Sequence, residues 1–294
     1  LQPVEPGDNL RPLRTPKAEV YKQIVSDLTN SINLLPVREQ YSGTDIGRAS
    51  KGSAEGMLAK VELTLGNYQR VVNLCDSVKN LGYTLNANYA DNFNPATENS
   101  AESLFEVQYV SGAGLDFWSN ENQASWLSTF TGPRGSNMVA GGWGWNQPTE
   151  EFVNSYEVGD KRKDVTVFYE GCPTFDGLAY KKSYSTTGYN LRKFVVSLSV
   201  SSSYDNSPLN FPVLRYADVL LMKAEALNEL GKTSDAQLPA TDANATLNKV
   251  RARAGLLNVT GLDQATLRNK ILHERRMELA FEGQRWYDLI RVNA

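Results

Sequence analysis

Apolar residues recur at helical spacing in the first part of the chain. Thr15 and Pro16 are typical of a helix start, and apolar residues then follow at steps of three or four as far as Pro36. The apolar residues of this run are Tyr21, Val25, Leu28, Ile32 and Leu35. The pattern predicts a first helix that ends before Pro36.

Two more helices are predicted between Ser50 and Gly82. Ser50 opens the second, whose apolar residues recur at helical spacing up to Gly66, and the third begins at Tyr68. The short Gly-Asn-Tyr turn between them is similar to the turn of tetratricopeptide repeats, although no strict repeat period recurs. The sequence therefore predicts a helical scaffold built from antiparallel helices at the start of the chain.

The middle of the chain is rich in glycine, serine, asparagine and aromatic residues. Short apolar runs at 104–107 and 193–196 predict brief strands. We expect three parts: repeat-like helices over 1–82, an irregular lobe with short strands over 83–210, and further helices over 211–294. Because loops vary without disturbing packed helices, ligand recognition is expected in the lobe.

The sequence after residue 210 again shows helical periodicity. A helix is predicted from Pro212 to Leu230, and Gly231 ends it. Its apolar stripe comprises Val213, Ala217, Leu220, Ala224 and Leu227. Asp218 and Glu225 lie two turns apart on the same side. A carboxylate pair for acid–base chemistry is conceivable, but we interpret them as anchors for neighbouring arginines.

Charged residues crowd the stretch from His273 to Arg291. His273-Glu274 begins like the helix of a zinc protease, but Met277 stands where the second histidine is required. Oppositely charged residues three apart predict a ladder of ion pairs between packed helices, formed by Glu282, Arg285, Asp288 and Arg291. The single histidine of the chain excludes a histidine-based triad and a multi-histidine metal site.

Composition narrows the class of protein. The chain of 294 residues is 41% hydrophobic and 21% charged, with a net charge of −3, so it can bury a sizeable core. Basic residues are scattered, which argues against a nucleic-acid partner. The sequence contains no run of eighteen apolar residues, so it predicts no membrane span. Cys75 and Cys172 are expected to be free thiols.

Several blocks after residue 209 closely resemble the C-terminal helical region of the SusD/RagB family. They match that family in both residue type and spacing. The blocks are Arg215-Tyr216-Ala217-Asp218, Ala224-Glu225-Ala226, Arg251-Ala252-Arg253-Ala254-Gly255, Glu274-Arg275-Arg276, Glu278-Leu279 and Phe281-Glu282-Gly283-Gln284-Arg285-Trp286. Ser103–Gln108, Asn146–Thr149, Asp160–Arg162 and Leu191–Phe194 resemble family segments in the same order.

The resemblance implies a mainly α protein: a SusD-like scaffold of tetratricopeptide-like helices with a long, loop-rich insert. It implies non-catalytic capture of oligosaccharides at the outer face of the outer membrane, and delivery to a TonB-dependent transporter of the SusC type. Attachment is expected through a lipidated cysteine in an N-terminal segment that this chain lacks, so we expect a piece of a longer protein. No cofactor is implied, and some relatives bind peptides instead of glycans.

Four of the five tryptophans fall in the insert, interleaved with glycines. Each ring either fills the core under the loops or forms an exposed platform, on which the axial C–H groups of a pyranose can lie. Asparagine and arginine side chains nearby can bind the sugar hydroxyls. The candidate ligand-binding residues are Trp118, Trp126, Trp143, Trp145, Asn120, Arg134 and Asn146. At least one of the tryptophans is expected to be exposed for binding.

Two other classes of protein remain open. Asp116 and Glu121 flank Trp118, as the paired carboxylates of a glycoside hydrolase would. Alternatively, the helices form a repeat scaffold that docks a protein helix in its groove. A calcium ion is conceivable in such loops, although no EF-hand pattern occurs.

Overall fold

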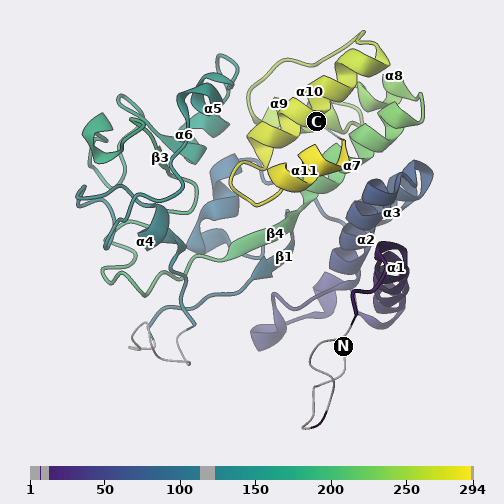
Figure 1. Cartoon of the computed structure of the whole chain (residues 1–294), viewed down its shortest axis with the longest axis horizontal. Helices are drawn as coiled ribbons and strands as arrows, with labels where there is room; N and C mark the ends of the chain where they lie inside the picture. Colours follow the sequence, from purple (N-terminus) through teal and green to yellow (C-terminus); the bar gives the residue numbers. More distant parts are fainter. Residues whose placement is uncertain (1–6, 8–12, 113–122, 293–294) are drawn as a thin grey trace.

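The computed structural model describes residue 7, residues 13–112 and residues 123–292 (Figure 1). Helices from both ends of the chain gather on one side, and the irregular lobe lies on the other (Figure 1). The α-helices of the scaffold are α1 (Lys17–Leu34), α2 (Lys51–Leu65), α3 (Tyr68–Asn80), α7 (Tyr216–Glu229), α8 (Thr233–Ala236), α9 (Leu247–Arg253), α10 (Gln264–Glu278) and α11 (Arg285–Arg291). The structure confirms the prediction of a mainly helical fold.

The described part of the lobe contains only short elements. Its α-helices are α4 (Leu127–Thr131), α5 (Glu150–Asn154) and α6 (Arg162–Thr166). Two antiparallel sheets of two strands each pair β1 (Ser103–Val107) with β4 (Phe211–Arg215), and β2 (Val167–Phe168) with β3 (Asn190–Leu191). Single turns of 3-10 helix occur at Arg38–Gln40, Gly43–Asp45, Tyr89–Phe93, Pro95–Thr97 and Lys182–Tyr184.

The first three helices form where the sequence predicts them. Ser50 caps α2 by accepting a hydrogen bond from the Ser53 amide at 3.3 Å, and Gly66 ends the helix in the left-handed conformation with φ +78°. Helix α1 contacts α2, but none of its residues is fully buried, and its five apolar positions are only half-buried. The firmly packed scaffold therefore starts at α2.

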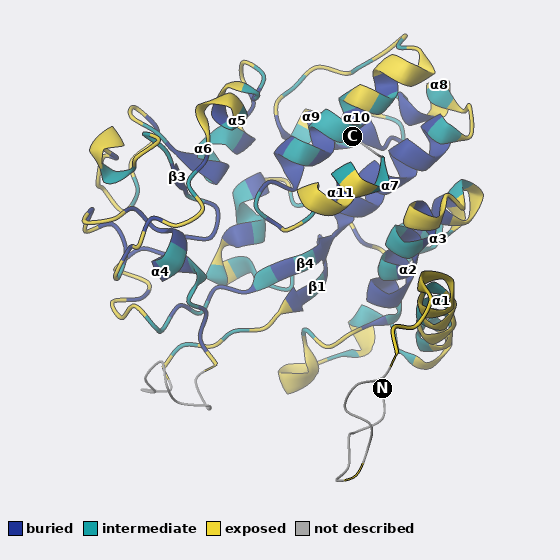
Figure 2. Cartoon of the chain, viewed as in Figure 1, coloured by how far each residue is buried: buried dark blue, intermediate teal, exposed yellow. Residues whose placement is uncertain are grey.

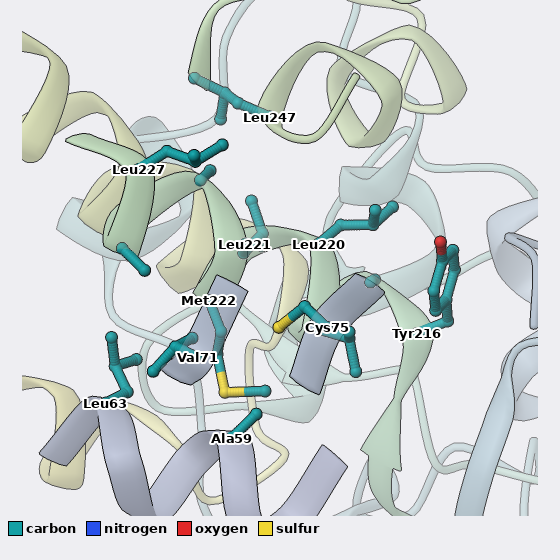
Figure 3. Packing of buried hydrophobic residues seen from close by; sticks show 14 of the residues in the cluster. Ala59, Leu63, Val71, Cys75, Tyr216, Leu220, Leu221, Met222, Leu227 and Leu247 are labelled. Carbon is teal, nitrogen blue, oxygen red and sulfur yellow. The ribbon is translucent and has the colours of Figure 1, made fainter. Parts of the chain in front are cut away.

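The main hydrophobic core joins the two ends of the chain. Side chains of α2 and α3, such as Leu63, Val71 and Cys75, pack against Leu221 and Met222 of α7 (Figure 3). In Figure 2, α7 is almost entirely dark blue, because it is covered on all sides. Both cysteines are buried and unbonded, which confirms the expectation of free thiols.

The predicted helix start at Pro212 is wrong. Residues 211–215 form strand β4, with Phe105 opposite Leu214 and Val107 opposite Phe211, and the helix begins only at Tyr216. Pro212 lacks an amide hydrogen but is tolerated on a strand that pairs on one side only. Alternate burial along the strand, with Pro212 and Leu214 inside, overrides the helical spacing of the apolar residues.

The strand predicted at 193–196 is also absent. Strand β3 ends at Leu191, and the Val195 amide donates to the Arg192 carbonyl at 3.1 Å to close a turn. The run is apolar because it is buried in the lobe, with Phe194 in one hydrophobic cluster and Val195 in another. A short apolar run cannot distinguish these two cases from sequence alone.

The two carboxylates on α7 do anchor neighbouring cations. Asp218 lies 2.7 Å from Lys60 of α2 and 2.7 Å from Arg275 of α10. Glu225 accepts a hydrogen bond from Arg291 of α11 at 3.0 Å. This confirms our interpretation of both residues as structural anchors.

The predicted ladder forms only in part. Asp288 and Arg291 pair at 3.0 Å, but among the described residues Arg285 forms no ion pair with Glu282 or Asp288. The chain leaves the helix between α10 and α11, where Phe281 takes a positive φ of 64°. Glu282 therefore turns inward, toward cations of the lobe and of β4.

A buried charge network joins the lobe to the scaffold, with Glu278 of α10 at its centre. Glu278 lies 2.9 Å from Arg215 and 3.2 Å from Arg162, and it also contacts Arg253. Burial by itself raises the pKa of Glu278, but the guanidinium groups of Arg253, Arg215 and Arg162 outweigh it and lower this pKa. The irregular lobe is thus held by fixed charges as well as by apolar packing.

Glu98 makes a pH-dependent contribution to stability where it contacts Asn210, the residue just before β4. Burial raises its pKa from 4.5 to about 7, against the hydrogen bond that it accepts from the Asn210 amide at 2.7 Å. Because the folded state favours the protonated acid, this stabilisation is present below about pH 4.5 and is lost as the pH rises through about 7.

We therefore expect Glu98→Gln to raise the melting temperature relative to the wild type more at pH 8 than at pH 5. The amide of glutamine keeps the hydrogen-bond acceptor but carries no charge. Thermal unfolding followed by circular dichroism at both pH values measures the difference. An equal shift at the two pH values would contradict the assignment.

Candidate functional site

Among the described residues, five aromatic rings gather at one place in the lobe. The ring of Phe130 is stacked on Trp145 with centroids 4.9 Å apart and lies 5.1 Å from Trp143. Trp143 lies 5.2 Å from Trp145 and 6.4 Å from Trp126, which meets Tyr204 edge-on at 5.4 Å. These five rings are hereafter called the aromatic cluster.

The cluster is open to solvent on one side. Trp143 is 38% exposed, Trp145 is 55% exposed and Tyr204 is 49% exposed. Trp126 and Phe130 are half-buried, contact each other and pack against the exposed rings. Exposed aromatic rings in contact with one another are typical of a binding surface, since their burial in the core would otherwise be favourable.

The backbone explains why both tryptophans face outward. The segment 142–145 runs beside α4, and the amides of Trp143 and Trp145 donate to the carbonyls of Thr129 at 2.8 Å and Phe130 at 2.7 Å. Gly142 and Gly144 alternate with the tryptophans and are buried. These hydrogen bonds hold the backbone of the segment against α4 with its two glycines buried, which leaves both indole rings on the exposed side.

Gly142 permits the close approach of this segment to the chain before it. Its φ is +64°, and a Cβ atom there would lie 2.5 Å from the Pro133 carbonyl oxygen. We expect Gly142→Ala to lower the free energy of unfolding by about 1–3 kcal/mol and to weaken ligand binding, because the segment must move.

Gly177→Ala is the matched control for that variant. Gly177 has a similar φ of +78°, but nothing lies within 4 Å of the position that its Cβ would take. It should therefore show the backbone cost without the clash. Urea unfolding and ligand titration of both variants test this, and equal effects would contradict the argument.

The structure brings together five of the seven predicted site residues. Trp126, Trp143 and Trp145 belong to the aromatic cluster. Arg134 and Asn146 are exposed; Asn146 directly follows Trp145, and Arg134 Cβ lies 3.8 Å from the position that a Cβ on Gly144 would take. The side chains of Arg134 and Asn146 form no hydrogen bond or ion pair with other described residues. Trp118 and Asn120 lie outside the described residues, as do Asp116 and Glu121.

Sequence reasoning missed three residues of the site. Phe130 follows Trp126 by four positions, the spacing that brings side chains together on a helix, and could have been found this way. Tyr204 is far from the others in sequence and carries no local signal. Gln147 stabilises segment 142–145, which carries Trp143 and Trp145. Its side-chain amide donates to the Gly144 carbonyl at 2.9 Å, and its side-chain oxygen accepts from the Ser185 hydroxyl at 2.9 Å.

Over residues 13–112 and 123–292, no three His, Cys, Asp or Glu side chains gather closely enough to hold a metal ion. His273 is half-buried, and burial lowers its pKa. None of the described helices is long and apolar enough to cross a membrane.

Comparison with known proteins finds a family model and several relatives that match the chain. The model of the SusD family matches residues 86–294. The chain is 30% identical to SusD-like protein P2 of Formosa agariphila, over 95% of this chain and 57% of that protein. It thus spans little more than half the length of the curated relatives that it matches.

Solved structures agree with this assignment. A SusD-like protein of Bacteroides fragilis superposes with a TM-score of 0.82 at 26% identity, covering 99% of this chain and 63% of the other. A laminarin-binding SusD-like protein superposes with a TM-score of 0.75 at 29% identity, covering 94% and 61%. The sequence motifs, the helical scaffold and these matches lead to one conclusion: this chain belongs to the SusD family.

Proposed function

We propose that this protein captures oligosaccharides by non-covalent binding at the aromatic cluster and does not catalyse their cleavage. The observation that carries the proposal is the pair of exposed tryptophans, Trp143 and Trp145, with Tyr204 beside them on one surface of the lobe. Rings held this firmly by main-chain hydrogen bonds lose little entropy when a ligand binds.

The chemistry of the surface suits a sugar. Axial C–H groups of a pyranose ring can pack on the indole faces, while its hydroxyl groups need donors and acceptors nearby. Arg134 and Asn146 offer both, and neither is engaged by another described side chain. Trp118 and Asn120 are proposed to extend the same site.

The comparisons support carbohydrate as the ligand class. One structural relative is a laminarin-binding SusD-like protein, and another is a surface glycan-binding protein from Bacteroides thetaiotaomicron in complex with laminarihexaose, although the latter is only 24% identical. Because the chain spans just over half of its curated relatives, the activity of the whole protein is part of the proposal.

The cellular role that we propose is based on the family. We propose that the whole protein is lipid-anchored at the extracellular face of the outer membrane. There it would pass bound oligosaccharide to a TonB-dependent transporter of the SusC type. Pull-down of that transporter from solubilised outer membranes with the whole protein would test the partnership.

A ligand panel measured by isothermal titration calorimetry tests the binding function. It should contain laminarihexaose, other neutral and acidic oligosaccharides, and peptides of similar size. We expect binding of at least one oligosaccharide and no release of reducing sugar on prolonged incubation. Binding of peptides alone would overturn the proposed ligand class, and release of reducing sugar would indicate a hydrolase.

A further inference from the structure

A hollow of about 320 Å³ lies in the lobe, between α5, α6 and the turn before β3. Asn154, Lys163, Tyr169, Glu170, Lys182 and Tyr189 are among the residues that line it. Its volume is at the lower end of the range for small-molecule sites, which is roughly 300–1,000 Å³. The hollow can therefore accommodate about one sugar residue.

The hollow contains two cations without ion-pair partners. Neither the Lys163 nor the Lys182 ammonium group forms an ion pair or hydrogen bond with another described residue. The Lys163 ammonium group lies 4.7 Å above the ring of Tyr169, which limits its motion. Glu170 is the single carboxylate among the described residues that line the hollow, so two cations face one anion.

Asp164, the neighbour of Lys163 on α6, is not among the residues that line the hollow. Asp164 on α6 accepts a short hydrogen bond from the Tyr169 hydroxyl. Among the other lining residues, Asn154 adds an amide without a hydrogen-bond partner among the described residues, whereas the Thr187 hydroxyl donates to the Tyr189 carbonyl at 3.3 Å. Ammonium and amide donors, with a net positive charge on the lining residues, are groups that bind an oxyanion.

One turn connects this hollow to the aromatic cluster. Gln147 follows the aromatic segment and donates to the Gly144 carbonyl at 2.9 Å. Its side-chain oxygen accepts hydrogen bonds from the Thr186 hydroxyl at 2.7 Å and the Thr186 amide at 3.1 Å. The next residues of the same turn, 187–189, line the hollow. Through Gln147, the turn thus links the hollow to the backbone of the segment that carries Trp143 and Trp145.

We infer that the hollow is a subsite for an acidic sugar residue, whose oxyanion is held by Lys163 and Lys182. This inference rests on the proposed function, because it extends the glycan site from the aromatic cluster to a charged position of the same ligand. Carboxylate of a uronic acid and sulfate ester of a sugar share the required chemistry.

The test uses three monosaccharide probes: glucose, glucuronate and glucose 6-sulfate. Each is titrated into ¹⁵N-labelled protein, and the amide resonances of Thr187 and Gly188 are followed. We expect saturable shifts with at least one anionic sugar and none with glucose at the same concentration. The tighter of the two anions identifies whether carboxylate or sulfate is preferred.

Lys163→Met combined with Lys182→Met is expected to weaken binding of the anionic sugar by about tenfold, because two exposed charge contacts are lost. The matched control is Lys232→Met, which removes an exposed lysine next to α8, outside the hollow, and should leave binding unchanged. Equal response to glucose and to the anions, no response to either anion, or wild-type affinity in the double variant would each overturn the inference.

Failure of the inference can be distinguished from failure of the proposed function. Oligosaccharide binding that depends on Trp143 and Trp145, without any response at Thr187 and Gly188 to the anionic sugars, contradicts the subsite alone. The opposite result, in which the anionic sugars bind and the tryptophans have no effect on any oligosaccharide, contradicts the function proposed for the aromatic cluster.

Discussion

Arg215→Leu is expected to lower the free energy of unfolding by about 3–5 kcal/mol, because it removes a buried cation that three buried carboxylates share. Arg215 is 2% exposed, and it donates to Glu102 at 2.6 Å, Glu278 at 2.9 Å and Glu282 at 2.7 Å. Its Nε donates to Glu282 at 2.9 Å, and Nη2 also donates to the Glu278 carbonyl at 3.1 Å. All five N–H groups of the guanidinium are therefore used.

Two further variants make this result interpretable. Arg215→Lys keeps the charge but offers three donors in place of a planar fork, so it should be destabilised less than Arg215→Leu. Arg285→Leu removes an exposed arginine that has no ion pair among the described residues and should change stability by less than about 0.5 kcal/mol.

Urea unfolding at pH 7 measures the free energies of all three variants. A loss in Arg215→Leu no larger than in Arg285→Leu would contradict the importance of the network. Since the pKa of Glu278 is lowered in the folded state, the contribution of its ion pairs should be complete above about pH 4.5 and should decrease as the pH falls further.

The second large effect is expected on ligand binding. Trp143→Ala combined with Trp145→Ala should weaken the oligosaccharide found in the panel about 30-fold, taking about 1 kcal/mol for each ring contact. Both rings are substantially exposed and contribute little to the core. We therefore expect the melting temperature to change by only a few degrees. A loss of affinity measured by calorimetry then reflects weaker binding and not unfolding of the variant.

Trp286→Ala provides the matched control. Trp286 is 68% exposed on α11, on the scaffold and outside the aromatic cluster. Its removal deletes an exposed indole of the same kind and should leave oligosaccharide affinity unchanged. Unchanged binding in the Trp143/Trp145 double variant, or an equal loss in Trp286→Ala, would remove the aromatic cluster from the site.

The sequence predicts the periodic parts of the fold best. Helices α1 to α3 follow their apolar spacing and end just before Pro36, Gly66 and Gly82, because local backbone preferences and capping act within a few residues. It fails at Phe211–Arg215, where pairing with β1 decides the conformation. The division of the chain at residues 82 and 210 stays a prediction.

The sequence singled out the tryptophans of the insert as candidates but could not decide their exposure. Trp143 and Trp145 face outward because hydrogen bonds from their amides to α4 fix the direction of the segment. Tyr204 joins them from a distant loop, through its edge contact with Trp126. Such contacts depend on how loops fold back, for which no periodic signal exists in the chain.

By itself, the sequence determined the family of this protein, its helical scaffold and the region in which to look for a ligand site. The tertiary structure alone decided what the charged residues of the family motifs do: Arg215, Arg253, Glu278 and Glu282 meet in one buried network. It also decided which aromatic rings stay in contact with water. The physical reason is that periodicity and caps are local properties, whereas charge pairing and exposure depend on residues far apart in the chain.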